Sequence, residues 1–169
     1  MSETTKVLVG KIDAGYIVMV NGRGTMEYCS DLFQFLSTKI DNEKIDDIYF
    51  ELSNANYLDS SFIGVIVSIQ KKCKKQENGD VIILNPSQKV KEILETMGLL
   101  EIMPLQEGKN YQNMEMSKEI ESKLEKNYHD IELLLQSHQN LMELNDENRK
   151  RFSLVRDMLE KEKERFKNE

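Results

Sequence analysis

Three short polar residues in a row, Asp59-Ser60-Ser61, form the segment of this sequence best suited to chemistry. They follow a strand-like stretch and precede a helical apolar pattern, so they stand at a helix start, where Asp and Ser are preferred caps. A helix needs a single cap, which leaves at least one hydroxyl without a structural duty. Gly64, in the first turn of that helix, costs about 1 kcal/mol relative to alanine and so indicates a close approach of another group to the backbone. From the residues alone, capping is the favoured explanation, and a modified hydroxyl is its competitor.

Other residue types that commonly do chemistry are sparse. His129 and His138 are the two histidines, and we expect both to be solvated or to lie on a helical seam rather than to act as bases or metal ligands. Residues 22–25 lack the third glycine and the lysine of a phosphate-binding loop. Cys29 and Cys73 each lie in an apolar-periodic segment and are expected to be buried small hydrophobes. The sequence therefore predicts no enzyme, no cofactor and no metal site.

Strands and helices that could position the Asp59-Ser60-Ser61 segment alternate along the first part of the chain. Strand patterns lie at residues 6–11, 16–20, 46–52, 81–84 and 99–105, and helical patterns lie at 26–40, 62–73 and 86–97. Strand–helix–strand order predicts parallel pairing through right-handed crossovers. The first two strands, joined by a short turn, add an antiparallel pair. We therefore expect an α/β fold with a mixed sheet covered by helices over residues 1–108.

The second part of the chain, residues 109–169, contains no glycine or proline, which predicts helix. Its apolar residues recur in steps of three and four, as in a heptad seam. An unbroken helix over 117–167 could form a coiled coil and make a homodimer, or bind another partner. A hairpin turning near Asn145-Asp146, or a tail folded back on its own domain, would bury the same stripe within one chain. These alternatives are equally open.

Composition limits the class of partner. Hydrophobic residues make up 39% of the chain and charged residues 31%, with a formal net charge of −7. This acidic balance argues against nucleic-acid binding, which needs a basic patch. Residues 1–6 are polar and do not resemble a signal peptide, and the apolar runs are too short to cross a bilayer. We expect a cytoplasmic protein that does not bind membranes.

The segment Tyr57–Gly64 resembles the signature of the STAS domain family, in which an aromatic or aliphatic pair precedes Asp-Ser-Ser-Gly-Leu-Gly. The resemblance covers about residues 6–105 and includes the strands at 48–52 and 81–84 and the step Met97-Gly98-Leu99. It is closest to the anti-sigma factor antagonists of that family. It implies that an anti-sigma serine kinase phosphorylates Ser60, with Ser61 the lesser candidate, and that a phosphatase reverses the modification. Unphosphorylated protein would then bind the kinase and free a sigma factor, and phosphorylated protein would let go.

Two departures from the family pattern affect the expected binding surface. Phe62 replaces the usual glycine, and we expect its ring on the exposed side, where it would fill or block a partner's pocket. Gly22-Arg23-Gly24-Thr25 stands where the family has Gly-x-Leu-Asp, so Arg23 reverses the local charge. The expected partner-binding residues are Asp59, Ser60, Ser61, Phe62, Gly64, Arg23 and Thr25. The alternative function is a scaffold subunit of a larger signalling or transport complex, without a switch, which the tail would assemble.

Overall fold

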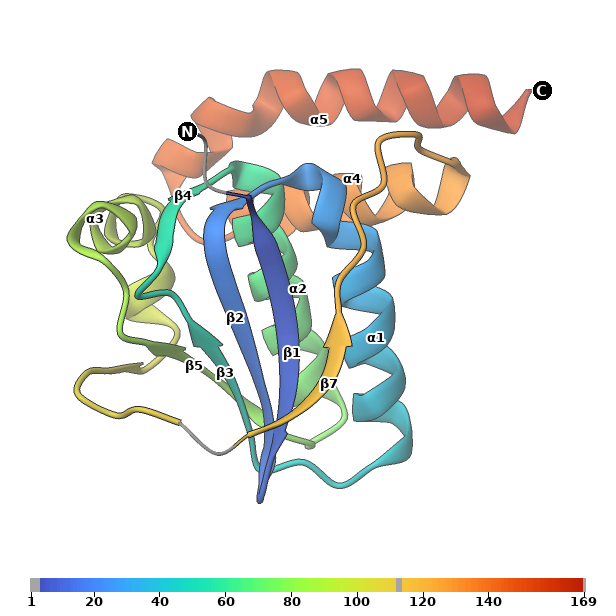
Figure 1. The fold of residues 1–169 in the computed structure, drawn as a ribbon. Helices are drawn as coiled ribbons and strands as arrows, with labels where there is room; N and C mark the ends of the chain where they lie inside the picture. The colour runs from blue at the N-terminus through green and yellow to red at the C-terminus, as the bar shows by residue number, and fades with distance from the viewer. Residues whose placement is uncertain (1–3, 112–113, 169) are drawn as a thin grey trace.

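A computed structural model of the chain describes residues 4–111 and 114–168. Within these residues, seven strands form one sheet in the order β6–β5–β3–β2–β1–β7, and β4 pairs with the end of β2 (Figure 1). The strands are β1 (Lys6–Ile12), β2 (Gly15–Gly24), β3 (Asp47–Glu51), β4 (Ala55–Leu58), β5 (Asp80–Leu84), β6 (Leu105–Gln106) and β7 (Glu115–Glu119). The helices are α1 (Cys29–Asn42), α2 (Ser60–Lys75), α3 (Gln88–Thr96), α4 (Tyr128–Met142) and α5 (Asp146–Lys167), with short 3-10 turns at Met26–Tyr28 and Leu99–Glu101.

Strand pairing confirms the mixed sheet. β1 and β2 form the antiparallel hairpin, whereas β2, β3, β5 and β6 pair in parallel. The sequence pattern predicts that the sheet ends before residue 108. This prediction is wrong, because β7 pairs antiparallel with β1. The predicted edge strand at 99–105 is found only at its end, since Leu99–Glu101 form a 3-10 turn and the edge strand β6 begins at Leu105. The division into a domain of residues 1–108 and a separable extension stays a prediction.

The main core lies between the sheet and the helices that cover one of its faces, α1 and α2 above all (Figure 1). Its largest buried side chains include Phe50, Phe62, Leu32, Leu36 and Ile66. On the opposite face of the sheet a smaller cluster joins Ile17, Tyr49, Ile82 and Leu84, and Tyr111 and Met114 pack against it. This packing holds β4 and the start of α2 in fixed positions at one end of the sheet.

The extension is helical, as predicted, but it forms a hairpin that folds back on the domain. α4 packs across α2, and α5 packs along α4 (Figure 1). The chain turns at residues 143–145, where the Asn145 side chain accepts a hydrogen bond from the Asn148 N–H and caps α5. A second cap, Asn127, forms a capping box with Asp130 at the start of α4. A continuous helix over 117–167 is therefore wrong, and the turn near Asn145-Asp146 is confirmed.

None of the helices in the described part of the chain is long and apolar enough to cross a membrane.

Candidate functional site

Asp59 is the residue that caps α2. Its Oδ1 accepts a hydrogen bond from the Phe62 N–H at 2.8 Å, and its Oδ2 accepts one from the Met26 N–H at 2.9 Å. The Asp59 N–H donates to the Gly24 carbonyl at 3.0 Å, which continues the pairing of β4 with β2. One carboxylate thus ties the starts of two helical segments to the end of the sheet. Neither serine hydroxyl acts as the cap.

Burial raises the pKa of the Asp59 carboxyl above its ordinary value. The backbone hydrogen bonds that it accepts, and the nearby His138, act in the opposite direction because they favour the charged form. The carboxylate is therefore held by its capping role in a place where charge is costly.

Ser60 contacts a residue that the sequence reasoning left out of the site. Its Oγ lies 3.0 Å from Nε2 of His138, which belongs to α4 and is 2% exposed. The Leu134 carbonyl lies 2.8 Å from Nδ1 of the same ring. Because a carbonyl can only accept, Nδ1 carries the proton in the neutral ring and Nε2 is the acceptor. The Ser60 hydroxyl therefore donates to His138.

His138 lies on the predicted seam, where its ring packs against Phe152 of α5, but it is buried rather than solvated. Burial lowers the pKa of its imidazole below the ordinary value of 6.5, and the Leu134 hydrogen bond and the Asp59 carboxylate oppose this effect. The His138 imidazole binds a proton better when it is exposed to water than when α4 packs against α2. Acid therefore favours separation of α4 from α2. The neutral His138 ring stabilises the contact between α4 and α2 fully above about pH 6.5. This stabilisation is lost progressively as the pH falls below that value.

Gly64 is a point of close approach between α2 and α4. A Cβ built on Gly64 would lie 2.8 Å from the Ser137 carbonyl oxygen and 2.9 Å from the Ser137 Cβ. The close approach that glycine indicated is thus real within this chain, and the approaching group is α4. Together with the Ser60–His138 hydrogen bond, it places α4 directly over the first turns of α2.

Comparison with the family pattern predicts that the Phe62 ring lies on an exposed side, and this prediction is wrong. The Phe62 side chain is 0% exposed and belongs to the main core. The ring packs beneath Gly24, where an added Cβ would come within 3.1 Å of it. The helical spacing of Phe62, Ile66 and Ile69 places Phe62 on the apolar face of α2. This spacing predicts the position of the ring better than the glycine that relatives have there. A direct contact between Phe62 and a partner is therefore wrong for this conformation.

Arg23 and Thr25 lie beside the motif, at the end of β2. Arg23 is exposed, and its guanidinium stacks over the Tyr57 ring at 4.3 Å from the centroid. Thr25 precedes the 3-10 turn at Met26–Tyr28, and its hydroxyl donates to Glu27 at 3.2 Å. These side chains border the Ser60 region, and the exposed cation can contact a partner.

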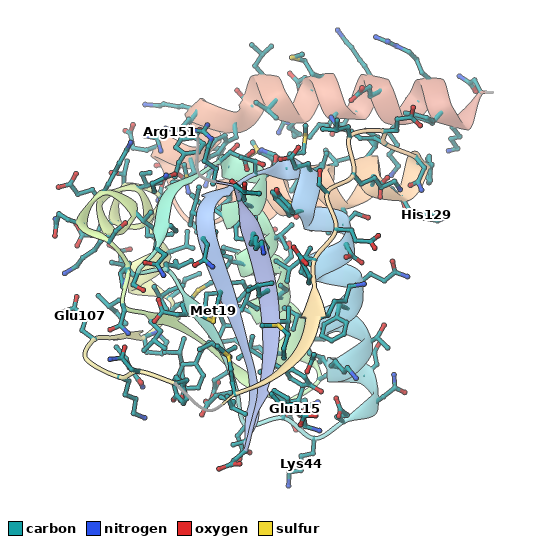
Figure 2. All side chains as sticks on the ribbon, viewed as in Figure 1. Met19, Lys44, Glu107, Glu115, His129 and Arg151 are labelled. Carbon is teal, nitrogen blue, oxygen red and sulfur yellow. The ribbon has the colours of Figure 1, made fainter. Side chains whose placement is uncertain are left out.

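Ser60 presents a hydroxyl that is held by a hydrogen bond to His138. Ser60 and His138 form a hydroxyl–imidazole pair, but a backbone carbonyl, not a carboxylate, orients Nδ1. The Phe62 N–H, which could stabilise an oxyanion, already donates to Asp59. In residues 4–111 and 114–168 there is no cluster of three or more His, Cys, Asp or Glu that could hold a metal. His129, labelled in Figure 2, is 86% exposed at the start of α4, whereas His138 lies in the second half of the same helix.

Comparisons with known proteins identify the family of this chain. The model of the STAS domain family matches residues 9–114. A curated relative, the anti-sigma-B factor antagonist of Staphylococcus aureus strain NCTC 8325 / PS 47, is 30% identical over 96 residues, which cover 57% of this chain and 87% of the relative.

Two solved structures share the fold at low sequence identity. The anti-sigma factor antagonist SpoIIAA in its unphosphorylated form has a TM-score of 0.56 at 16% identity, covering 62% of this chain and 89% of that one. The Bacillus cell fate determinant SpoIIAA in the phosphorylated form has a TM-score of 0.53 at 15% identity, covering 62% of this chain and 92% of that one. With the family match spanning more than half of the residues, the chain belongs to the STAS domain family.

Proposed function

We propose that this protein is an anti-sigma factor antagonist whose binding to an anti-sigma serine kinase is set by phosphorylation of Ser60. The observation that carries the proposal is the position of the Ser60 hydroxyl. It stands on the first residue of α2 while Asp59 does the capping, so it is free of the structural duty that a serine at a helix start usually has. Ser61 is the weaker candidate because its side chain is buried.

Physical reasoning gives the direction of the switch. The start of α2 presents the positive end of the helix dipole, which tolerates an anion. Phosphorylation adds roughly −2 charge next to the Asp59 carboxylate. A partner that packs closely against an uncharged hydroxyl must then desolvate a dianion or leave. Unphosphorylated protein thus binds the kinase and frees a sigma factor, and phosphorylated protein releases the kinase until a phosphatase restores the hydroxyl.

Relatives support the same role. The curated relative is named an anti-sigma-B factor antagonist, and SpoIIAA has been solved in unphosphorylated and phosphorylated forms. On this proposal the protein works in the cytoplasm by binding rather than by catalysis. Its binding surface is Asp59, Ser60 and Ser61 at the helix start, with the exposed Arg23 and the half-buried Thr25 beside them.

A second candidate is a scaffold without a switch. The observation that favours it is the hydrogen bond between Ser60 and His138, which occupies the hydroxyl inside the protein. In that case the STAS domain and its hairpin would assemble a larger signalling or transport complex, and phosphate would play no part.

One experiment separates these candidates. The full-length protein is purified from its own cells under mild conditions, and any co-purifying ATP-binding serine kinase is identified. Its affinity is then measured for wild type, Ser60→Ala and Ser60→Asp, with Ser61→Ala as the matched control. We expect Ser60→Asp to bind more weakly and Ser60→Ala and Ser61→Ala to bind at least as well as wild type. Equal affinity for all four proteins rules out the switch and leaves the scaffold.

A further inference from the structure

The contact between the hairpin and α2 extends beyond the site along the same side of α2. Ser68 Oγ lies 3.1 Å from Ser137 Oγ and accepts a hydrogen bond from Asn140 Nδ2 at 3.0 Å. Further along, the Lys71 ammonium donates to Asn140 at 3.0 Å and pairs with Glu143 at 2.9 Å. α4 thus covers the side of α2 that begins at Ser60, which we call the Ser60 face: Ser60, Gly64, Ser68 and Lys71.

Polar groups dominate the contact on the Ser60 face. Three buried polar residues of α4 lie there: Ser137, His138 and Asn140. Each side chain lies within hydrogen-bonding distance of a serine hydroxyl, and Ser137 also packs against the backbone of Gly64. When such a contact opens, its hydrogen bonds are replaced by hydrogen bonds to water, so the net loss is modest. An apolar contact of the same extent would resist opening more strongly.

The hairpin can leave as a unit because it has its own apolar cluster. Ile131, Leu134 and Leu135 of α4 pack with Leu159 of α5, and Val155 and Phe166 join them. The segment that connects β7 to α4 has no helix or strand at residues 120–127, and residues 121–125 are exposed. Movement of the hairpin about this segment therefore need not disturb the sheet.

Apolar anchors at the turn of the hairpin keep it closed. Leu141, Met142 and Phe152 are buried in the main core, and the Asn148 amide donates to the Met97 carbonyl at 2.9 Å. The closed state is therefore the resting state, and something that binds the open state better must drive the hairpin off.

We propose that the α4–α5 hairpin is a displaceable cover that occupies the Ser60 face in cis, so that the hairpin and a protein partner compete for this surface. The nature of the partner, an anti-sigma kinase, rests on the proposed function, whereas the cover does not. A partner must break the Ser60–His138 hydrogen bond to reach the hydroxyl. The apparent affinity of the partner is then its affinity for the open face multiplied by the fraction of molecules that are open.

The cover is tested by the reactivity of a thiol placed at the site. Full-length Ser60→Cys is reacted with DTNB, and the native Cys29 and Cys73 contribute little because they are buried and burial raises their pKa values. Adding Ser137→Arg puts a bulky charge against Gly64, and we expect it to speed labelling by about tenfold or more through opening of the hairpin. Adding Leu154→Arg, on the exposed side of α5, is the matched control and should leave the rate unchanged. Equal rates in all three proteins overturn the cover.

A reversible lock keeps the test decisive if Ser137→Arg unfolds the protein, as circular dichroism would show. The Oγ atoms of Ser68 and Ser137 are 3.1 Å apart, so the double variant Ser68→Cys/Ser137→Cys can be oxidised to tie α4 to α2. We expect amide exchange at residues 57–64 to be slower in the oxidised form and restored by reductant. The same exchange in both forms overturns the cover.

The lock also separates the cover from the proposed function. If the co-purified kinase binds the reduced form and not the oxidised form, partner and hairpin compete. Equal binding to both forms overturns the competition and leaves the proposed function standing. Binding to neither form counts against the proposed function, and the thiol and exchange measurements then decide the cover alone.

Discussion

Gly64→Ala adds one methyl group where α4 packs tightly against α2, and the contacts of that methyl group give its expected effect. The added Cβ would lie 2.8 Å from the Ser137 carbonyl oxygen and 2.9 Å from its Cβ, and neither atom can rotate away. Overpacking of this kind costs about 1–3 kcal/mol. Alanine in a helix gains about 1 kcal/mol over glycine. Docking of the hairpin should therefore weaken by about 1–3 kcal/mol. The free energy of global unfolding should change by only about 0–2 kcal/mol, because α2 itself becomes a better helix.

Hydrogen exchange measured by mass spectrometry reads the two effects separately. Peptides from α4 should exchange faster by up to about 150-fold, the factor that corresponds to about 3 kcal/mol of local opening, while peptides from α1 should not change. Ser137→Gly removes the facing Cβ and leaves the carbonyl in place. A double-mutant cycle of the two substitutions therefore isolates the Cβ contact, and we expect a favourable coupling.

Stabilisation of the whole protein by Gly64→Ala, with unchanged exchange in α4, would refute this reasoning. It would mean that α4 does not pack against Gly64 in solution. The glycine would then owe its place in the sequence to something outside this chain.

Four further outcomes follow from the same contacts. Thermal stability of the hairpin should fall as the pH drops below about 6.5, the ordinary pKa of a histidine, and His138→Gln should weaken this pH dependence in melts followed by circular dichroism. Phe62→Ala should cost about 3–5 kcal/mol in urea unfolding because the ring is fully buried; a loss under 1 kcal/mol would contradict the core position. Asp59→Ala should cost about 1–2 kcal/mol through loss of the cap, measured in the same way. Truncation after residue 108 should be less stable than truncation after residue 124, because it also removes β7 from the edge of the sheet; equal stability would restore the original boundary.

Elements with strong periodicity could be predicted from the sequence. The β1–β2 hairpin, α2 and the buried strand β5 follow directly from apolar spacing and turn residues. β7 was missed because its sequence, Glu115–Glu119, is mostly charged and has only one apolar residue, so pairing with β1 rather than local preference makes it a strand. β4 (Ala55–Leu58) was missed for a similar reason, because it is only four residues long and is held as a strand by its pairing with β2.

The site was only half visible in the sequence. Asp59 and Ser60 stand where their types predict, because capping is a local property. The contact of Ser60 with His138 joins residues 78 positions apart and depends on how the hairpin docks, which no local pattern records. Gly64 was the one available signal, since an energetically costly glycine inside a helix indicated a close neighbour without naming it. Homodimerisation through the C-terminal helix stays a prediction that light scattering on the full-length protein can check.

Phosphate mapping on the full-length protein tests the central claim most directly. Protein incubated with the co-purified kinase and ATP is digested, and the peptides that span Asp59–Gly64 are sequenced by mass spectrometry, with Ser60→Ala treated in parallel. We expect a single phosphoryl group on Ser60. It should be absent from the Ser60→Ala protein, and its addition should release the kinase. Phosphate on another residue, or none under conditions in which the kinase is active, would contradict it.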